Sequence, residues 1–471
     1  MNRCNQSLGE YVVPQRKPSK DDMGRCLNEY YRLPSDWNGR FLCKEGCGDP
    51  GFFRFGSEVC YGRCASGPTA KVPRGALYDA FGSVYLEQGS VCLPFNPSEV
   101  IDNLRGERYT SLLSSGRRNM SRSVFVRKMY YGLREFLPIR VRRQLQRAYF
   151  SGWRELGFPN WPVDSTVDSL HEDFLRLSMA AKGIKRVPFI WFWPEGAANC
   201  LIMTHDVETV SGRDFTDSLM DLDDAYGIKA AFQVVPEERY EVPDSFVEEI
   251  RARGFEFNVH DLNHDGTLFR DHRQFLHRAA KINEYVRKYQ SLGFRSGSMY
   301  RNQDWYNAYE FRYDMSVPSV AHLEPQRGGC CTIMPYFIGD IVEIPLTTAQ
   351  DYSLFHILKD YSLDVWKTQI SLIQAKHGLI SFIIHPDYVI ESRARRTFEG
   401  LLDYLREMIS REDIWLTLPR EVDRWWRVRS RMTLVPNGPN WVIEGPEKER
   451  ARVAFAVLDG DRLVYEFQEA K

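Results

Sequence analysis

Short apolar runs that alternate with amphipathic stretches dominate the chain from about residue 187 onward. Six runs have the length and composition of buried strands, at residues 200–204, 229–235, 255–259, 293–296, 340–345 and 379–384. Between them, apolar residues recur at helical spacing over 244–253, 271–288, 363–376 and 395–410. A further strand is predicted at 415–418 and a closing helix at 421–431. This alternation predicts an α/β sheet or barrel with crossover helices.

The regions on either side have a different texture. Residues 1–110 are rich in Gly, Pro and aromatic residues with little periodicity, whereas short alternating runs after residue 432 predict a β appendage. A chain of 471 residues is also too long for one ordinary core. We therefore predict a cysteine-containing N-terminal region of unknown role (1–110), a basic helical linker (111–186), an α/β domain (187–431) and a small β appendage (432–471).

The segment 117–154 is strongly basic. It carries eleven Arg and Lys residues and one acidic residue, Glu135, and Glu155 comes directly after it. Apolar residues recur in it at helical spacing, namely Phe125, Met129, Leu133, Phe136 and Leu137. Such a helix can lie on an anionic membrane surface, which would make the protein a peripheral membrane protein. Alternatively, the apolar stripe docks on the neighbouring domain while the arginines stay in water, which is the commoner use of such stripes.

Overall composition is that of a well-packed globular protein, with 43% apolar and 13% aromatic residues. The formal net charge is −1, so the protein has no overall positive electrostatic field that would attract nucleic acid, and we expect no nucleic-acid partner. No apolar run approaches the roughly 20 residues that span a bilayer. The first residues lack the apolar core of a signal peptide, so we expect a cytoplasmic protein whose ten cysteines are mostly reduced.

Four cysteines in the N-terminal region have a spacing similar to that of a zinc site. The pairs Cys43/Cys47 and Cys60/Cys64 each enclose three residues, where two are usual. Scattered buried thiols are the alternative interpretation, and we prefer it.

Ionisable side chains follow four of the predicted strands. The sequences at these four strand ends are His205-Asp206-Val207-Glu208, His260-Asp261-Leu262-Asn263-His264, Phe294-Arg295-Ser296-Gly297 and His385-Pro386-Asp387. Charged groups are costly at the end of a buried strand unless they have partners or a function. In alternating strand–helix barrels, catalytic residues lie just past the carboxyl ends of the strands. Together, the four motifs predict one catalytic site.

With these motifs in this order, residues 190–425 resemble the polysaccharide deacetylase (NodB-homology) family. The resemblance implies a distorted (β/α)-barrel of about seven strands and a metal-dependent carbohydrate N-deacetylase, a hydrolase acting on a non-peptide C–N bond. It also implies that Glu208, His260 and His264 bind the metal, with Glu208 one position later than in the commonest form. Two imidazoles and one carboxylate are a usual catalytic zinc set with an open position for water. We exclude His205 as a ligand, because in a regular strand it points to the opposite face.

The family resemblance also implies the catalytic groups. Asp206 matches the catalytic base, Arg295 the arginine that orients it, and His385 the general acid that protonates the leaving amine. Tyr300 matches an aromatic residue whose backbone N–H helps to bind the oxyanion. For the carboxylate that tunes His385, the first choice is Asp314 and the second is Asp304.

The family's usual substrates are N-acetylated sugars. For a cytoplasmic protein we expect a nucleotide-linked or lipid-linked amino sugar, or an oligosaccharide, in cell-surface polysaccharide biosynthesis. Trp305, Tyr306 and Tyr388 are candidates for stacking on sugar rings, although aromatic residues are more often packing. Two alternatives remain open: hydrolysis of another amide, such as a cyclic ureide, and a non-catalytic sugar-binding protein on the same fold.

Overall fold

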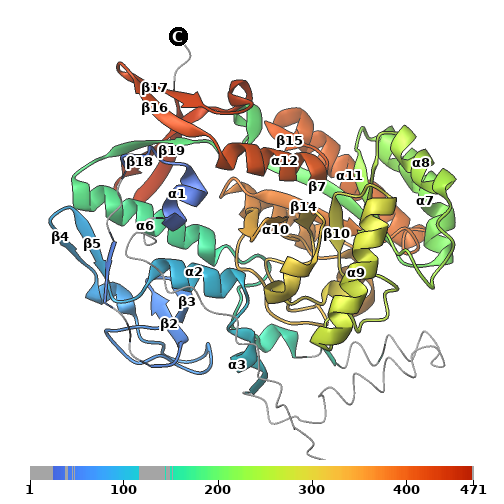
Figure 1. Ribbon diagram of the computed structural model, residues 1–471, viewed down its shortest axis with the longest axis horizontal. Helices are drawn as coiled ribbons and strands as arrows, with labels where there is room; N and C mark the ends of the chain where they lie inside the picture. Colours follow the sequence, from blue (N-terminus) through green and yellow to red (C-terminus); the bar gives the residue numbers. More distant parts are fainter. Residues whose placement is uncertain are drawn as a thin grey trace, which may run out of the picture.

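A curled parallel sheet forms the centre of the molecule (Figure 1). The computed structural model describes residues 25–37, 41–44, 46, 48–115, 144, 149, 150 and 152–468. Consecutive parallel neighbours in the sheet are β13 (Ile341–Glu343), β11 (Tyr313–Asp314), β10 (Gly293–Arg295), β9 (Glu256–His260), β8 (Ala230–Val234), β7 (Asn199–Val207) and β14 (Leu379–Ile384). These seven strands confirm the predicted barrel-like α/β fold.

The chain that follows β13 brings the two ends of this sheet together. The Thr348 amide donates a hydrogen bond of 3.3 Å to the Ser381 carbonyl oxygen on β14, and the Thr347 hydroxyl donates one of 2.7 Å to that of Leu379. Two short strands lie at the margins: β12 (Tyr336–Ile338) runs antiparallel to β13, and β15 (Ile414–Leu416) pairs with β7. Closure through a loop rather than a full strand makes the barrel distorted.

Amphipathic helices cover the outside of the sheet. They are α7 (Val210–Ala225), α8 (Asp244–Ala252), α9 (His272–Lys288), α10 (Asp364–Gln374) and α11 (Ser392–Arg411), and Figure 1 shows α7, α8 and α9 along one side. Side-chain caps fix where three of them begin: Thr209 accepts from the Gly212 amide, Asp271 from that of Gln274, and Glu391 from that of Ala394. Each fully buried Leu or Phe on their inner faces contributes about 1.5–3 kcal/mol.

The N-terminal region forms small sheets and short helices beside the barrel. Its elements are α1 (Arg25–Tyr31), β1 (Phe41–Cys43), β2 (Gly51–Phe55), β3 (Glu58–Gly62), β4 (Tyr85–Glu87), β5 (Ser90–Leu93), α2 (Pro97–Arg105) and α3 (Thr110–Ser115). The long helix α6 (Thr166–Lys182) lies between this region and the barrel, and β6 (Arg186–Ile190) follows it. Aromatic side chains of β2, including Phe52, Phe53 and Phe55, are fully buried.

One of the C-terminal strands pairs with a strand that precedes the barrel. After α12 (Pro419–Ser430) come β16 (Thr433–Asn437), β17 (Asn440–Glu444), β18 (Val453–Asp459) and β19 (Arg462–Phe467). Strand β18 runs antiparallel to β6, with Val453 opposite Ile190 and Val457 opposite Arg186. One hydrophobic core contains side chains of α1, α6, β6, α12 and β18. The division into four domains stays a prediction. The shared core joins side chains from the regions before and after the barrel.

Several sequence predictions fall on positions outside the described residues. Most of the basic segment 117–154 does, so neither its membrane role nor its docking role is tested. Cys47 lies outside as well, while Cys60 and Cys64 are buried free thiols. Within the described part of the chain, no helix is both long enough and apolar enough to cross a membrane.

Candidate active site

The four motifs meet at the carboxyl ends of the barrel strands. The alternation of side chains along β7 directs Thr204 and Asp206 to one face of the strand and His205 to the other. The Thr204 hydroxyl accepts a hydrogen bond of 2.8 Å from Arg295 on that inner face. On the other face, the His205 imidazole contacts the carboxylate of Asp223 at 2.8 Å. His205 therefore lies on the face of β7 away from Asp206, as the alternation of side chains along a strand predicts.

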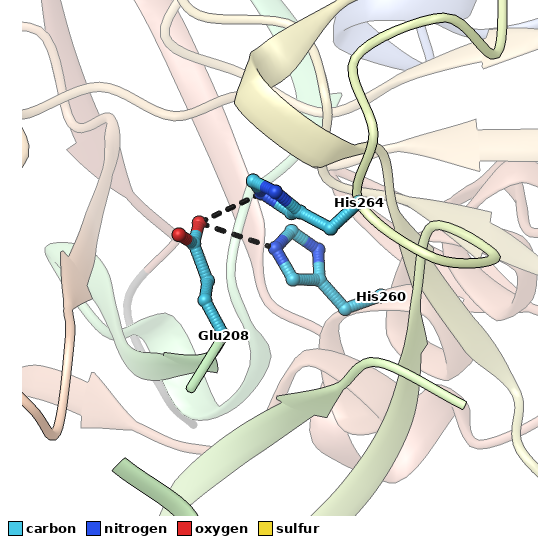
Figure 2. Close-up of side chains that lie close together, drawn as sticks. All are labelled: Glu208, His260 and His264. Carbon is cyan, nitrogen blue, oxygen red and sulfur yellow. Dashed lines mark ion pairs between the residues drawn. The ribbon is translucent and has the colours of Figure 1, made fainter. Parts of the chain in front are cut away.

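Three side chains converge as a candidate metal-binding group (Figure 2). Glu208 Oε1 lies 2.8 Å from His264 Nε2 and 3.6 Å from His260 Nε2. One ligand atom from each residue lies within 4.8 Å of the others, and this is the sole such group of three found within the described residues. The two histidines are almost fully buried, and the Glu208 side chain is 18% exposed. The sequence predicted this same set of three residues.

The hydrogen bonds around this group fit a bound divalent ion. His260 donates through Nδ1 to the Arg295 carbonyl oxygen at 3.0 Å, so Nε2, which lies 3.6 Å from Glu208 Oε1, is the ring nitrogen available to a metal ion. The buried Nε2 atoms of His260 and His264 lie near Glu208 Oε1 but make no hydrogen bond of regular geometry. Burial raises the pKa of Glu208, but His264, His260 and His385 outweigh it and hold that pKa well below its usual value. A carboxylate and two imidazoles in this state are zinc-type ligands.

Asp206 lies beside the triad and is held by Arg295. Arg295 Nη1 donates to Asp206 Oδ1 at 2.6 Å, and Arg295 Nε donates to the Met315 carbonyl oxygen at 3.0 Å. The second oxygen of Asp206 lies 3.8 Å from His260 Nε2. Burial raises the pKa of Asp206, yet Arg295 and the nearby imidazoles more than offset this and lower it. Asp206 is thus a fixed, ionised carboxylate at the edge of the candidate metal position.

His385 completes the site from β14, and its partner is a residue that the sequence reading missed. The His385 Nδ1 atom lies 2.7 Å from Asp351 Oδ1, and the His385 amide donates to Asp351 Oδ2 at 2.7 Å. The other ring nitrogen lies 3.5 Å from Glu208 Oε1. Burial lowers the pKa of His385, but Asp351 and Glu208 outweigh it and raise that pKa well above its usual value.

This pairing corrects the prediction of Asp314 or Asp304. Asp314 lies at the end of β11, where it accepts hydrogen bonds from the Tyr306 hydroxyl at 2.9 Å and the Ser316 hydroxyl at 2.7 Å. Asp304 is exposed in a short 3₁₀ turn. The Asp351 carboxylate reaches His385 because residues 346–348, which close the barrel, carry the chain to the end of β14. Catalytic residues lie just past the carboxyl ends of barrel strands, so the loop after the predicted strand 340–345 was a place to search for this carboxylate.

Tyr300 lies in a tight loop after β10. Its amide donates a 3.3 Å hydrogen bond to the Gly297 carbonyl oxygen within a 3₁₀ turn, so this N–H group is directed into the loop. Gly297 fits because it has no side chain: a Cβ there would lie 2.4 Å from Asp261 Oδ2 and 2.9 Å from His264 Cδ2. The loop therefore packs directly on a predicted metal ligand.

Partly exposed rings surround His385. Tyr388 has its ring centroid 4.7 Å from that of His385, and His356 lies 4.6 Å from Tyr388. Of the stacking candidates from the sequence, Tyr388 is thus at the site. Tyr306 is buried against Asp314, and Trp305 packs on Phe275.

Asp387 is a further carboxylate at this end of the barrel for which the sequence reading proposed no role. Its buried Oδ1 atom has no hydrogen-bond partner. Burial raises the pKa of Asp387 to about 6, with a lowering contribution from His385 and raising ones from Glu208 and Asp351. Asp387 therefore adds a titratable group close enough to His385 for the two charges to interact.

Comparison with known proteins gives structural neighbours alone: no family model and no curated protein matches the sequence. A protein from Mycobacterium smegmatis named as a polysaccharide deacetylase aligns at 16% identity and a TM-score of 0.42, covering 53% of this chain and 98% of its own. An allantoinase aligns at 14% identity and 0.40, covering 50% and 92%. A Pseudomonas aeruginosa protein, also named as a polysaccharide deacetylase, aligns at 12% and 0.38, covering 49% and 91%. At these values we draw nothing about function from the neighbours.

Proposed function

We propose that this protein is a metal-dependent N-deacetylase that removes the acetyl group from an amino sugar. One observation carries the proposal. Three imidazole Nε2 atoms, those of His264, His260 and His385, lie 2.8, 3.6 and 3.5 Å from the same Glu208 oxygen. Asp206 with its arginine and His385 with its carboxylate flank this point from two sides. A base, an acid and a metal-ligand set around one position are the groups that amide hydrolysis needs.

Glu208, His260 and His264 would hold the ion, and their mixed nitrogen and oxygen donors match zinc. When bound, such an ion supplies Lewis acidity that activates water and polarises an amide carbonyl. The protein keeps its own ligands in place: the Arg295 carbonyl oxygen fixes the ring of His260 through Nδ1.

Two residues move protons in this proposal. Asp206 accepts a proton from the attacking water, and its hydrogen bond to Arg295 keeps the receiving carboxylate oriented. His385 donates a proton from Nε2 to the leaving nitrogen, while Asp351 holds the Nδ1–H side of the ring. The amine must leave as a neutral group, so this donation is required for the C–N bond to break.

The surroundings of His385 favour a sugar as the substrate. Tyr388 and His356 offer partly exposed rings beside the acid, and the apolar face of a pyranose stacks on such rings. Tyr352, with its ring 6.3 Å from Tyr388, extends this surface. We propose a nucleotide-linked or lipid-linked N-acetylated amino sugar, or an oligosaccharide, used at the cytoplasmic face in cell-surface polysaccharide synthesis.

The direct test is acetate release. The purified protein, loaded with Zn²⁺, is incubated separately with a nucleoside diphosphate-linked N-acetylhexosamine, an N-acetylglucosamine oligosaccharide and a cyclic ureide. We expect acetate and a free amine from at least one sugar substrate, and loss of both products after chelation. Ring opening of the ureide without acetate release from any sugar would favour the alternative hydrolase. Sugar binding without any hydrolysis would favour a non-catalytic protein.

A further inference from the structure

A buried ion pair joins the N-terminal region to a loop of the candidate active site. Arg301 Nε donates to Glu107 Oε2 at 2.6 Å, and Arg301 Nη2 pairs with the other carboxylate oxygen. Both side chains are nearly inaccessible, at 1% and 6% exposure. Two buried charges in this bidentate geometry are costly to separate, since each would remain unpaired. The pair therefore fixes residues 107 and 301 relative to each other.

The loop that Arg301 holds has an unfavourable backbone. Ser298 and Met299 both have a positive φ of 54°, a region that residues with a side chain rarely adopt. Such conformations persist where the surroundings impose them, and they cluster at functional sites. Here Arg301 Nη1 donates to the Met299 carbonyl oxygen at 2.7 Å. The Arg301 side chain thus links this strained turn to Glu107.

The same loop contacts both sides of the site. At its start, Gly297 donates to Asp261 Oδ2 at 3.2 Å and lies so close to His264 that a Cβ would come within 2.9 Å of the ring. In its middle, Met299 packs with Leu346 and Ile383, and Ile383 is two residues before His385 on β14. A shift of this loop would therefore displace His264, the predicted metal ligand, and the strand β14 that carries His385.

The N-terminal partner of the loop is itself firmly placed. Glu107 follows α2 and has a positive φ of 53°, and its carboxylate also accepts a 2.6 Å hydrogen bond from the Gly329 amide. The Tyr109 hydroxyl donates to the Gly329 carbonyl oxygen at 2.6 Å, and Gln303 Nε2 donates to the Arg105 carbonyl oxygen at 2.8 Å. The turn after α2 thus holds two loops of the barrel's catalytic end.

We infer that Glu107 is a positioning residue of the active site: through Arg301 it holds the loop 297–301 against His264. The N-terminal region then has a role in the chemistry of the barrel, beyond packing beside it. The inference rests on the proposed function for its catalytic meaning, because it concerns the placement of a metal ligand. The positioning of His264 by this loop can be tested by metal binding, without measuring catalysis.

The experiment compares two buried arginines in the full-length protein. Arg301→Lys keeps the charge but loses the bidentate pair and the bond to Met299. Arg429→Lys is the matched control: Arg429 is equally buried and also binds the N-terminal region, donating to the Tyr30 carbonyl oxygen at 2.9 Å, but it bonds the Trp191 and Ile190 carbonyls instead of an active-site loop. We measure Zn²⁺ affinity by calorimetry, the visible absorption of the Co²⁺-loaded protein, and thermal unfolding.

The inference predicts that Arg301→Lys weakens Zn²⁺ binding by about 10-fold and alters the Co²⁺ spectrum, while Arg429→Lys changes only the melting temperature. Equal metal affinity in wild type and Arg301→Lys would overturn it, as would equal losses in both variants. If Arg301→Lys fails to fold, Glu107→Gln, which keeps the size of the side chain, takes its place with the same expectations. A wild-type protein that binds no divalent ion would contradict the proposed function instead.

Discussion

Strand β9 carries a buried polar cluster at each end, and the two clusters differ in one respect. At its start, Glu256 accepts hydrogen bonds from the Tyr313 hydroxyl and the Arg420 amide, and Asn258 accepts from the Gly293 amide and the Ser291 hydroxyl. At its end, His260 keeps a buried Nε2 atom without any hydrogen-bond partner. In the first cluster, the carboxylate of Glu256 and the amide of Asn258 find hydrogen-bond partners within the protein. In the second, the Nε2 atom of His260 does not.

The difference matters because buried polar groups are nearly always hydrogen-bonded. A complete cluster such as that of Glu256 supports the fold and needs no ligand. Around His260, the buried atoms His264 Nε2 and Arg295 Nη2 also make no hydrogen bond of regular geometry, and they belong to side chains that pair with Glu208 and Asp206. Unsatisfied groups that converge point to something the site binds. At this end of β9, atoms without partners converge on a carboxylate, and this convergence supports a ligand-binding site.

Removing the base should have the largest effect on turnover. Asp206→Asn keeps the shape of the side chain but cannot accept the water proton, so we expect turnover to fall by about 10²–10⁴-fold. The three metal ligands are untouched, so metal content should stay at the wild-type level. Loss of metal in this variant would show that Asp206 is itself a ligand and that another group acts as the base.

The two candidate carboxylates for His385 can be compared directly. Asp351→Asn should lower turnover by up to about 10²-fold, because the imidazole loses the partner that orients it and stabilises its protonated form. Asp314→Asn should leave turnover per folded molecule near wild type, since Asp314 bonds Tyr306 and Ser316 instead. Steady-state rates of both variants, normalised to folded protein, decide between them. A greater loss in Asp314→Asn would restore the sequence-based choice.

A single methyl group should perturb the loop on His264. Gly297→Ala places a Cβ 2.4 Å from Asp261 Oδ2, so the loop or the ligand must move. We expect roughly 10-fold weaker metal binding and about 1–3 kcal/mol lower stability. Gly82→Ala is the control, because nothing lies within 4 Å of the added Cβ and no positive φ is required. Unchanged metal affinity in Gly297→Ala would mean that the loop does not position His264.

The smallest effect is expected at the opposite end of β9. Burial raises the pKa of Glu256, and hydrogen bonds from Tyr313 and the Arg420 amide lower it. The effect of burial is the larger, so the pKa lies above its usual value of 4.5. Folding therefore favours the protonated acid, a contribution present below pH 4.5 and lost as pH rises through the folded-state pKa. Glu256→Gln removes this titration. On going from acidic to neutral pH, the unfolding free energy of this variant should therefore fall less than that of wild type, and its metal affinity should be unchanged. Urea unfolding at two pH values measures this; an identical pH dependence would count against the assignment.

Local patterns predicted the barrel, and the family resemblance added the residues that gather at its candidate site. The strands are apolar runs that end in charged residues, and the alternation along β7 brings Asp206 to the inner face and His205 to the outer one. Asp351 was not predictable in this way, because it reaches His385 through an irregular segment that closes the barrel. Contacts between distant parts of the chain carry no local pattern either, and the pair of Glu107 with Arg301 is the clearest example.

The most direct test of the central claim is a Zn²⁺ titration of the metal-free protein by calorimetry, with His264→Ala and His205→Ala beside it. Both variants remove a buried imidazole, but only His264 faces Glu208, whereas His205 bonds Asp223 on the other side of β7. The proposed site predicts about one ion per wild-type chain, comparable binding by folded His205→Ala, and binding weakened beyond detection in His264→Ala. Absence of binding in wild type, or equal binding by His264→Ala, would contradict a metal centre at Glu208, His260 and His264.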